Sequence, residues 1–138
     1  MSAKPERGLL ELGEATVQSG PEAALCARRF LASWLDGRYD AWLRDDACLL
    51  VSELVSNSVR HAGQPPGAPV RITATARAAL LRVAVEDKGD GRVIRRPPDL
   101  DEGGFGLNLV DRLAARWGST HEQSTEVWFE LATTAAPA

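Results

Sequence analysis

Glu53-Leu-Val-Ser-Asn57-Ser-Val-Arg-His61 is the stretch of this chain that most restricts its fold. Glu53 and Asn57 stand four residues apart, so in a helix the carboxylate and the carboxamide project from neighbouring points on one face. An apolar stripe at helical spacing lies on the other side: Val51, Val55, Val59 and Ala62. The pattern predicts an amphipathic helix whose polar stripe, which ends at His61, is separate from the core.

Two glycine-rich stretches follow the predicted helix, Asp87-Lys-Gly89-Asp-Gly91 and Gly103-Gly104-Phe-Gly106-Leu107. Asp87 comes at the end of an apolar strand pattern, where a carboxylate can accept a hydrogen bond from an exocyclic amine such as that of adenine. Glycines let the backbone approach a base closely, and the second stretch precedes a helix whose free N–H groups can hold phosphate. Each stretch alone is also ordinary turn or helix-start chemistry. Together, in this order, the three stretches predict an ATP site.

Other nucleotide-binding patterns are absent from the sequence. There is no G-x-x-x-x-G-K-[ST], and Gly89-Asp-Gly91 lacks the third glycine of a dinucleotide fingerprint, so P-loop and Rossmann sites are excluded. An Asn57 side-chain oxygen is a hard ligand suited to Mg²⁺, which takes its other ligands from phosphates and water. Glu53 can then serve as a general base. Taken without the glycine stretches, a Glu/Asn pair at this spacing favours a solvated helix face over a metal and base pair.

Composition limits the class of protein. With 138 residues the chain is predicted to form one domain over residues 8–132, with flexible ends at 1–7 and 133–138. A net charge of -3 argues against direct binding of nucleic acid. No apolar run has membrane-spanning length and the first residues do not resemble a signal peptide, so a cytoplasmic protein is expected. Cys26 and Cys48 fall in apolar helical patterns and are predicted to be reduced core thiols.

The element order follows from turn signals and hydrophobic periods. We expect a strand from Leu9 to Val17, then a helix capped by Ser19 that runs to Gly37 and a second helix from Asp45 or Asp46 to Gly63. A loop over 64–69 leads to two strands over 70–76 and 81–85, and an irregular segment covers 89–103. A third helix is expected from Phe105 or Gly106 to Gly118, followed by a strand from Glu126 to Leu131. His121 is expected on the surface. This order predicts an α+β fold, with a mixed, mostly antiparallel sheet and helices on one face.

The three stretches resemble the GHKL ATPases, a superfamily that includes histidine kinases, gyrase-type topoisomerases, heat-shock chaperones and mismatch-repair proteins. Residues 53–62 are similar to the N box of that superfamily, and 87–91 and 103–110 to its two glycine boxes. Within the superfamily, the short chain and the wording Ser52-Glu-Leu-Val-Ser-Asn-Ser-Val-Arg-His-Ala62 resemble the stand-alone bacterial anti-sigma-factor serine kinases.

The resemblance implies a Bergerat-fold, two-layer sandwich that binds ATP and Mg²⁺. It implies that Asn57 holds the metal, that Asp87 reads adenine and that Glu53 activates a substrate hydroxyl. The remaining positions implied to contact nucleotide are Gly89, Gly91, Gly104, Gly106, Leu107 and Thr125, although Ser124-Thr125 is equally a turn. The implied reaction passes the γ-phosphate to a serine or threonine of a STAS-type antagonist protein, with a sigma factor as second partner and a homodimer as the assembly.

Three positions depart from the pattern of the resembled kinases. Those kinases commonly carry a cation at the second glycine box, whereas this chain has Glu102 before the glycines and Phe105 between them. Arg95 or Arg96 could supply the charge from the preceding segment. Asp90 adds negative charge beside Asp87. The alternative function is therefore a nucleotide-gated protein that sequesters a sigma factor or other partner without phosphorylating it.

Overall fold

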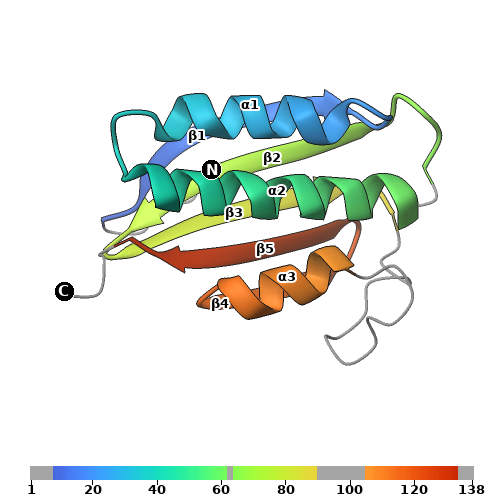
Figure 1. The fold of residues 1–138 in the computed structure, drawn as a ribbon. Helices are drawn as coiled ribbons and strands as arrows, with labels where there is room; N and C mark the ends of the chain where they lie inside the picture. The colour runs from blue at the N-terminus through green and yellow to red at the C-terminus, as the bar shows by residue number, and fades with distance from the viewer. Residues whose placement is uncertain (1–7, 62–63, 90–104, 134–138) are drawn as a thin grey trace, which may run out of the picture.

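The structure is a computed structural model that describes residues 8–61, 64–89 and 105–133, and it forms two layers (Figure 1). The elements in chain order are β1 (Leu10–Gln18), α1 (Ala23–Leu35), α2 (Ala41–His61), β2 (Pro69–Arg77), β3 (Leu80–Asp87), α3 (Phe105–Leu113), β4 (Arg116–His121) and β5 (Thr125–Ala132). The described strands form one sheet in the order β1-β2-β3-β5-β4, and each neighbouring pair is antiparallel. The helices cover one face of this sheet (Figure 1). The predicted α+β fold with helices on one face is confirmed.

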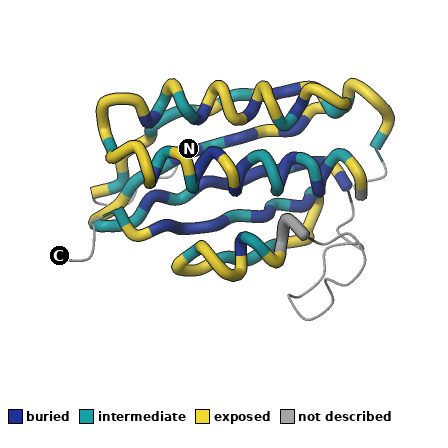
Figure 2. The backbone as a smooth tube through the Cα atoms, in the orientation of Figure 1, coloured by how far each residue is buried: buried dark blue, intermediate teal, exposed yellow. Residues whose placement is uncertain are grey.

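The core lies between the helices and the covered face of the sheet (Figure 2). Strand side chains alternate between the two faces, so every second residue of the central strands points at the helices. Val70, Ile72 and Ala74 of β2 are buried in this way. Leu81, Val83 and Val85 of β3 and Val127, Phe129 and Leu131 of β5 continue the same layer. Full burial of one such aliphatic side chain contributes about 1.5–3 kcal/mol, so the period-two pattern of the sequence decides which face is covered.

Helix α2 is longer at its start than the sequence predicts. It begins at Ala41, not at Asp45 or Asp46, and the Arg44 amide donates a 3.1 Å hydrogen bond to the Asp40 carbonyl. The reason is burial, because Leu43 is 2% exposed and continues the helical row of Ala47 and Leu50. Packing of this extra turn outweighs the capping preference of the aspartates. The predicted end at Gly63 lies outside the described residues.

Helix α1 begins without the predicted cap. Its N-cap residue is Glu22, which makes no side-chain capping bond. The Ser19 backbone instead donates to Ala68 and accepts from Gly67, so this serine joins β1 to the loop before β2. The predicted stop is confirmed, because the helix ends at Leu35 and Gly37 follows with φ +76°.

The sequence pattern does not predict β4 (Arg116–His121). The third helix was expected to reach Gly118, but α3 ends at Leu113 and residues 116–121 form β4. Trp117 pairs with Phe129 across the β4–β5 ladder and packs against the core, and the Ala115 amide donates to the Glu130 carbonyl. Burial of the Trp117 ring is compatible with either element, so the local pattern favoured a helix and pairing with β5 decided for a strand. His121, the last residue of β4, is exposed as expected.

The two cysteines differ in environment. Cys48 is buried in α2 and donates its thiol to the Arg28 carbonyl, whereas Cys26 is exposed on α1, so the prediction of a core thiol is wrong at Cys26. Burial raises the pKa of the Cys48 thiol, and the negative charge of Asp45 adds to this effect. Cys26 lies one position before the buried Ala27, just outside the covered stripe of α1. Both thiols are free.

Within the described residues, no helix combines the length and the apolar character that crossing a membrane requires.

Gly13 of β1 lies directly against the Trp34 ring of α1. A Cβ atom at this position would lie 2.1 Å from Cδ2 of Trp34, so alanine cannot fit unless the indole moves. Gly13 also adjoins the irregularity in the β1–β2 ladder between Glu11 and Gly13. We expect Gly13→Ala to lower the free energy of unfolding by roughly 1–3 kcal/mol, measured by urea denaturation. In a Trp34→Ala background the same substitution should cost much less, and equal losses in both backgrounds would contradict this explanation.

Candidate functional site

The candidate site forms where the C-terminal half of α2 contacts the end of β3, beside the start of β5. Asp87 is the last residue of β3, is 8% exposed, and lies on the helix side of the sheet. Its Oδ2 accepts a hydrogen bond from the hydroxyl of Ser58 on α2, and its Oδ1 accepts one from the Gly89 amide at 2.7 Å. Each carboxylate oxygen has two acceptor positions, so Asp87 retains capacity for a further donor such as an exocyclic amine.

The backbone of Gly89 is held from two sides. Its amide donates to Asp87, and its carbonyl accepts a 2.7 Å hydrogen bond from Oγ1 of Thr125. Thr125 is the first residue of β5, is 3% exposed, and pairs directly with Asp87 across the β3–β5 ladder. The first glycine stretch is therefore fixed at its first glycine by the two strands on which it rests. The sequence is compatible with Thr125 as a phosphate contact or as a turn residue. In the structure its hydroxyl donates to the Gly89 carbonyl.

Asn57 is more deeply buried than the sequence predicts. It is 3% exposed, because it continues the buried row of Leu50 and Leu54 along α2. The prediction of a polar stripe separate from the core is wrong at this residue: α2 packs against α1, α3 and the sheet, so its buried arc is wider than one apolar stripe. Glu53, one turn earlier, is half-buried and borders the same arc. Both side chains come from the helix that supplies Ser58.

Ser58 is the residue of this site that sequence reasoning missed. It is 7% exposed and lies on the helix face that Leu54 and Val55 also bury. A serine on an otherwise apolar helix face needs a hydrogen-bond partner, and here the partner is the Asp87 carboxylate. The polar residue within the apolar face was the available signal, and the partner 29 positions away was not visible in the pattern.

The second glycine stretch enters the described residues only at α3. This helix begins at Phe105, so Gly106 and Leu107 lie in its first turn, and it packs against α2. The helix start is thus near the predicted position, although nothing is described of the side chains of Phe105 and Leu107. Several predicted site positions lie outside the described residues: Asp90, Gly91, Arg95, Arg96, Glu102, Gly103 and Gly104.

The side chains of the candidate site fit Mg²⁺ when phosphate oxygens supply most of its ligands. Within the described part of the chain, no group of three or more His, Cys, Asp or Glu side chains is arranged to hold a metal ion. One Asn57 oxygen is a suitable hard ligand, and Mg²⁺ commonly combines one or two protein ligands with phosphate oxygens and water. The residues present therefore fit a nucleotide-bound Mg²⁺ and do not form a separate metal cage.

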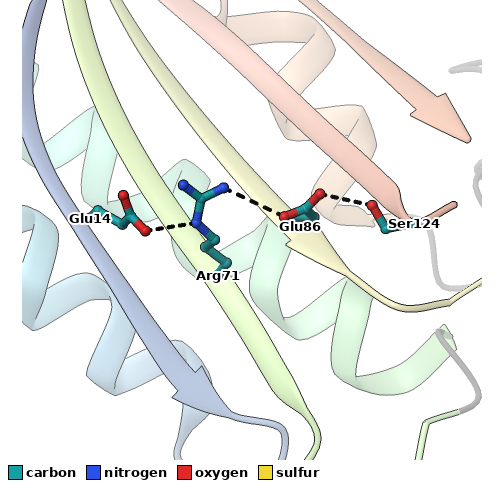
Figure 3. Close-up of polar contacts among 4 residues, drawn as sticks. All are labelled: Glu14, Arg71, Glu86 and Ser124. Carbon is teal, nitrogen blue, oxygen red and sulfur yellow. Dashed lines mark hydrogen bonds and ion pairs between the residues drawn. The ribbon is translucent and has the colours of Figure 1, made fainter. Parts of the chain in front are cut away.

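A polar chain crosses the open face of the sheet behind Asp87 (Figure 3). Arg71 of β2 donates from Nε to Glu14 of β1 at 2.9 Å, and its Nη1 lies 3.6 Å from Oε1 of Glu86 on β3. Glu86 Oε2 accepts a 2.8 Å hydrogen bond from the Ser124 hydroxyl. The hydrogen bond from Arg71, and then its charge, lower the pKa of Glu14, and the same bond raises the pKa of Arg71. A cavity of about 200 Å³ beside this chain is lined by Thr16, Arg71, Glu86 and Lys88 among others.

Comparison with known proteins agrees with this geometry. Residues 17–131 match the family model described as "Histidine kinase-like ATPase domain". No curated protein matches the chain. Among solved structures, the chain is similar to the crystal structure of the RsbU and RsbW domains of Rv1364c from Mycobacterium tuberculosis. The TM-score is 0.66 at 21% identity, over 87% of this chain and 31% of that one, so the likeness establishes the shared fold. Because the family model matches residues 17–131, which is most of the chain and includes α2 and both glycine stretches, the chain belongs to the histidine kinase-like ATPase domain family.

Proposed function

We propose that this protein binds MgATP and transfers the γ-phosphate to a serine or threonine of a STAS-type antagonist protein, in the manner of the anti-sigma-factor kinases that its motifs resemble. The observation that carries the proposal is the buried Asp87 carboxylate, held by Ser58 and Gly89 at the junction of α2, β3 and β5. Membership of the histidine kinase-like ATPase domain family supports ATP as the ligand. The similarity to the RsbU and RsbW domain structure supports the shared fold, and the proposed role in regulating a sigma factor rests on the resemblance of the three motifs.

Each residue of the site has a role in this proposal. Asp87 accepts the exocyclic amine of adenine, and Ser58 fixes the carboxylate for that contact. Gly89 and Gly91 let the backbone pass close to the base. Gly104 precedes α3 in the sequence and Gly106 and Leu107 belong to its first turn, where backbone amides suit phosphate. Thr125 supports the first glycine stretch. Mg²⁺, when bound, neutralises phosphate charge, and Asn57 offers it one oxygen ligand.

Glu53 is the proposed general base. It lies one helical turn before Asn57 on α2, at the edge of the buried arc. Its carboxylate is therefore near the proposed metal ligand and, in this proposal, does not itself coordinate Mg²⁺. In phosphoryl transfer the protein mainly positions the reactants and compensates charge, and a base accepts the proton of the attacking hydroxyl. The serine or threonine hydroxyl of the partner would lose its proton to Glu53 as it attacks the γ-phosphate.

A second candidate function is supported by the composition of the second glycine stretch. Glu102 and Phe105 occupy positions where the resembled kinases commonly place a cation, so charge compensation at the γ-phosphate is weaker in this chain unless Arg95 or Arg96 provides it. The alternative is a nucleotide-gated protein that sequesters a sigma factor or other partner. Under this alternative MgATP changes partner affinity and no phosphoprotein forms.

Asp87→Asn should weaken ATP binding by about ten- to hundredfold, because the amide removes the charged acceptor and presents a donor to the adenine amine. Isothermal titration calorimetry with MgATP measures this effect. Asp36→Asn is the matched control, since Asp36 lies between α1 and α2 and its exposed carboxylate pairs with Arg44 in the first turn of α2, away from Asp87. Wild-type affinity in Asp87→Asn would exclude the proposed adenine contact.

Asn57→Ala should remove most of the dependence of ATP affinity on Mg²⁺, because the proposed metal ligand is lost while Asp87 and Ser58 remain. The measurement is the ratio of ATP dissociation constants with and without Mg²⁺, which should fall toward one in the variant. Ser52→Ala on the same helix is the control, since its hydroxyl donates a 2.8 Å hydrogen bond to the Leu49 carbonyl of α2. A ratio equal to that of the wild type would reject Asn57 as the metal ligand.

Glu53→Gln should reduce phosphoryl transfer by at least about a hundredfold and leave the MgATP dissociation constant within about twofold of the wild type. Transfer of label from γ-³²P-ATP to STAS-type proteins, followed by phosphoamino-acid analysis, measures both activity and Ser/Thr specificity. Equal labelling by wild type and variant would reject the base assignment. No labelling by the wild type, together with an ATP-dependent change in partner affinity, would favour the sequestering function.

A further inference from the structure

We propose that Ser124 and Glu86 are positioning residues that hold the Asp87–Gly89 turn in place from the opposite face of the sheet. The consequence for nucleotide binding rests on the proposed function, whereas the positioning itself concerns only this chain. Neither residue belongs to the three motifs of the site. Both lie one position before a residue of the site, since Glu86 precedes Asp87 and Ser124 precedes Thr125.

The alternation of strand side chains makes this arrangement a two-sided clamp. Asp87 and Thr125 pair across the β3–β5 ladder, and both are buried on the helix side, where they hold the amide and the carbonyl of Gly89. Glu86 points to the open face, where it accepts the 2.8 Å hydrogen bond from Ser124 (Figure 3). The same two chain segments are therefore joined on both faces of the sheet within one residue of each other.

The Glu86–Ser124 bond closes the ladder at the point where it would otherwise fray. The register of β3 with β5 ends at Asp87 and Thr125, and the hairpin turn from β4 arrives there through Glu122, whose amide donates to the Ser124 carbonyl at 3.1 Å. Strand ends are the least constrained part of a ladder. The Ser124 hydroxyl links this turn to β3 and so restricts how far Asp87 and Thr125 can separate.

Arg71 and Glu14, the other members of the polar chain, orient the Glu86 carboxylate that accepts the Ser124 hydrogen bond. Arg71 lies directly opposite Glu86 in the β2–β3 ladder, 3.6 Å from its Oε1, and Arg71 is itself held by Glu14 of β1. The Glu86 side chain therefore has one oxygen near Arg71 and the other on Ser124. Arg71 and Glu14 remain 46% and 59% exposed, and such exposed ion pairs add little stability. Their main effect is on the orientation of Glu86. The polar chain thus connects β1, β2 and β3 with Ser124 in the turn before β5.

The test replaces Ser124 with alanine and measures amide hydrogen exchange of Gly89 by NMR in the protein without nucleotide. We expect Gly89 exchange to become about fivefold faster, because the turn opens more often when the outer contact is lost. The amide of Leu31, which is fully buried in α1, reports global unfolding and should keep its rate within about twofold. Ser124→Thr restores the hydroxyl and should restore the wild-type rate at Gly89.

Ser119→Ala is the matched control, since its hydroxyl lies 3.1 Å from Nε2 of His121 on β4, which β5 separates from β3 in the sheet. Glu86→Gln weakens the same contact from the acceptor side and should shift Gly89 exchange in the same direction. Unchanged Gly89 exchange in both Ser124→Ala and Glu86→Gln would overturn the inference. So would acceleration of Gly89 and Leu31 together, because that result means general destabilisation and no positioning effect.

The link to nucleotide is tested separately with the same variants. Ser124→Ala should raise the dissociation constant for MgATP about fivefold, while Ser119→Ala and Ser124→Thr stay near the wild type. If the wild type itself shows no saturable ATP binding, the proposed function fails and Gly89 exchange alone decides the positioning role. If the wild type binds ATP and Ser124→Ala binds it equally well, the proposed consequence for nucleotide binding is overturned, and Gly89 exchange still decides the positioning role.

Discussion

The site depends on a buried carboxylate that must be satisfied. Asp87 is 8% exposed at the end of β3, and an unpaired carboxylate at that depth would be costly. Ser58 satisfies it from α2 and the Gly89 amide satisfies it from the turn that follows, so one side chain ties a helix, a strand and a loop together. This constraint explains why a serine is placed on an otherwise apolar face of α2.

The sheet works as a two-sided support for this constraint. Its covered face carries the apolar core and, at one end, Asp87 and Thr125. Its open face carries the polar chain of Glu14, Arg71, Glu86 and Ser124 (Figure 3). Because strand residues alternate between the faces, consecutive residues contribute to different faces: Asp87 and Thr125 lie on the covered face at the candidate site, and Glu86 and Ser124 lie on the open face.

The edges of the molecule show where local pattern and tertiary structure compete. Residues 116–121 have an inward-facing tryptophan and a glycine that can end a helix, yet they pair with β5 as an edge strand. The start of α2 extends to Ala41, since Leu43 finds a buried position against the rest of the core. In both places the sequence pattern was compatible with two answers, and contacts with residues far along the chain selected one of them.

The sequence by itself determined the two-layer α+β fold, the covered faces of β2, β3 and β5, and the order of the nucleotide motifs, because periods of two and 3.6 and glycine positions are local properties of the chain. It also indicated Asp87 at a strand end, where β3 does end. Only the tertiary structure decided the burial of Asn57, the exposure of Cys26, the role of Ser58 and the clamp of Thr125 on Gly89. Each of these depends on which segment packs beside the residue, and a partner 29 or 36 positions away leaves no mark on local periodicity.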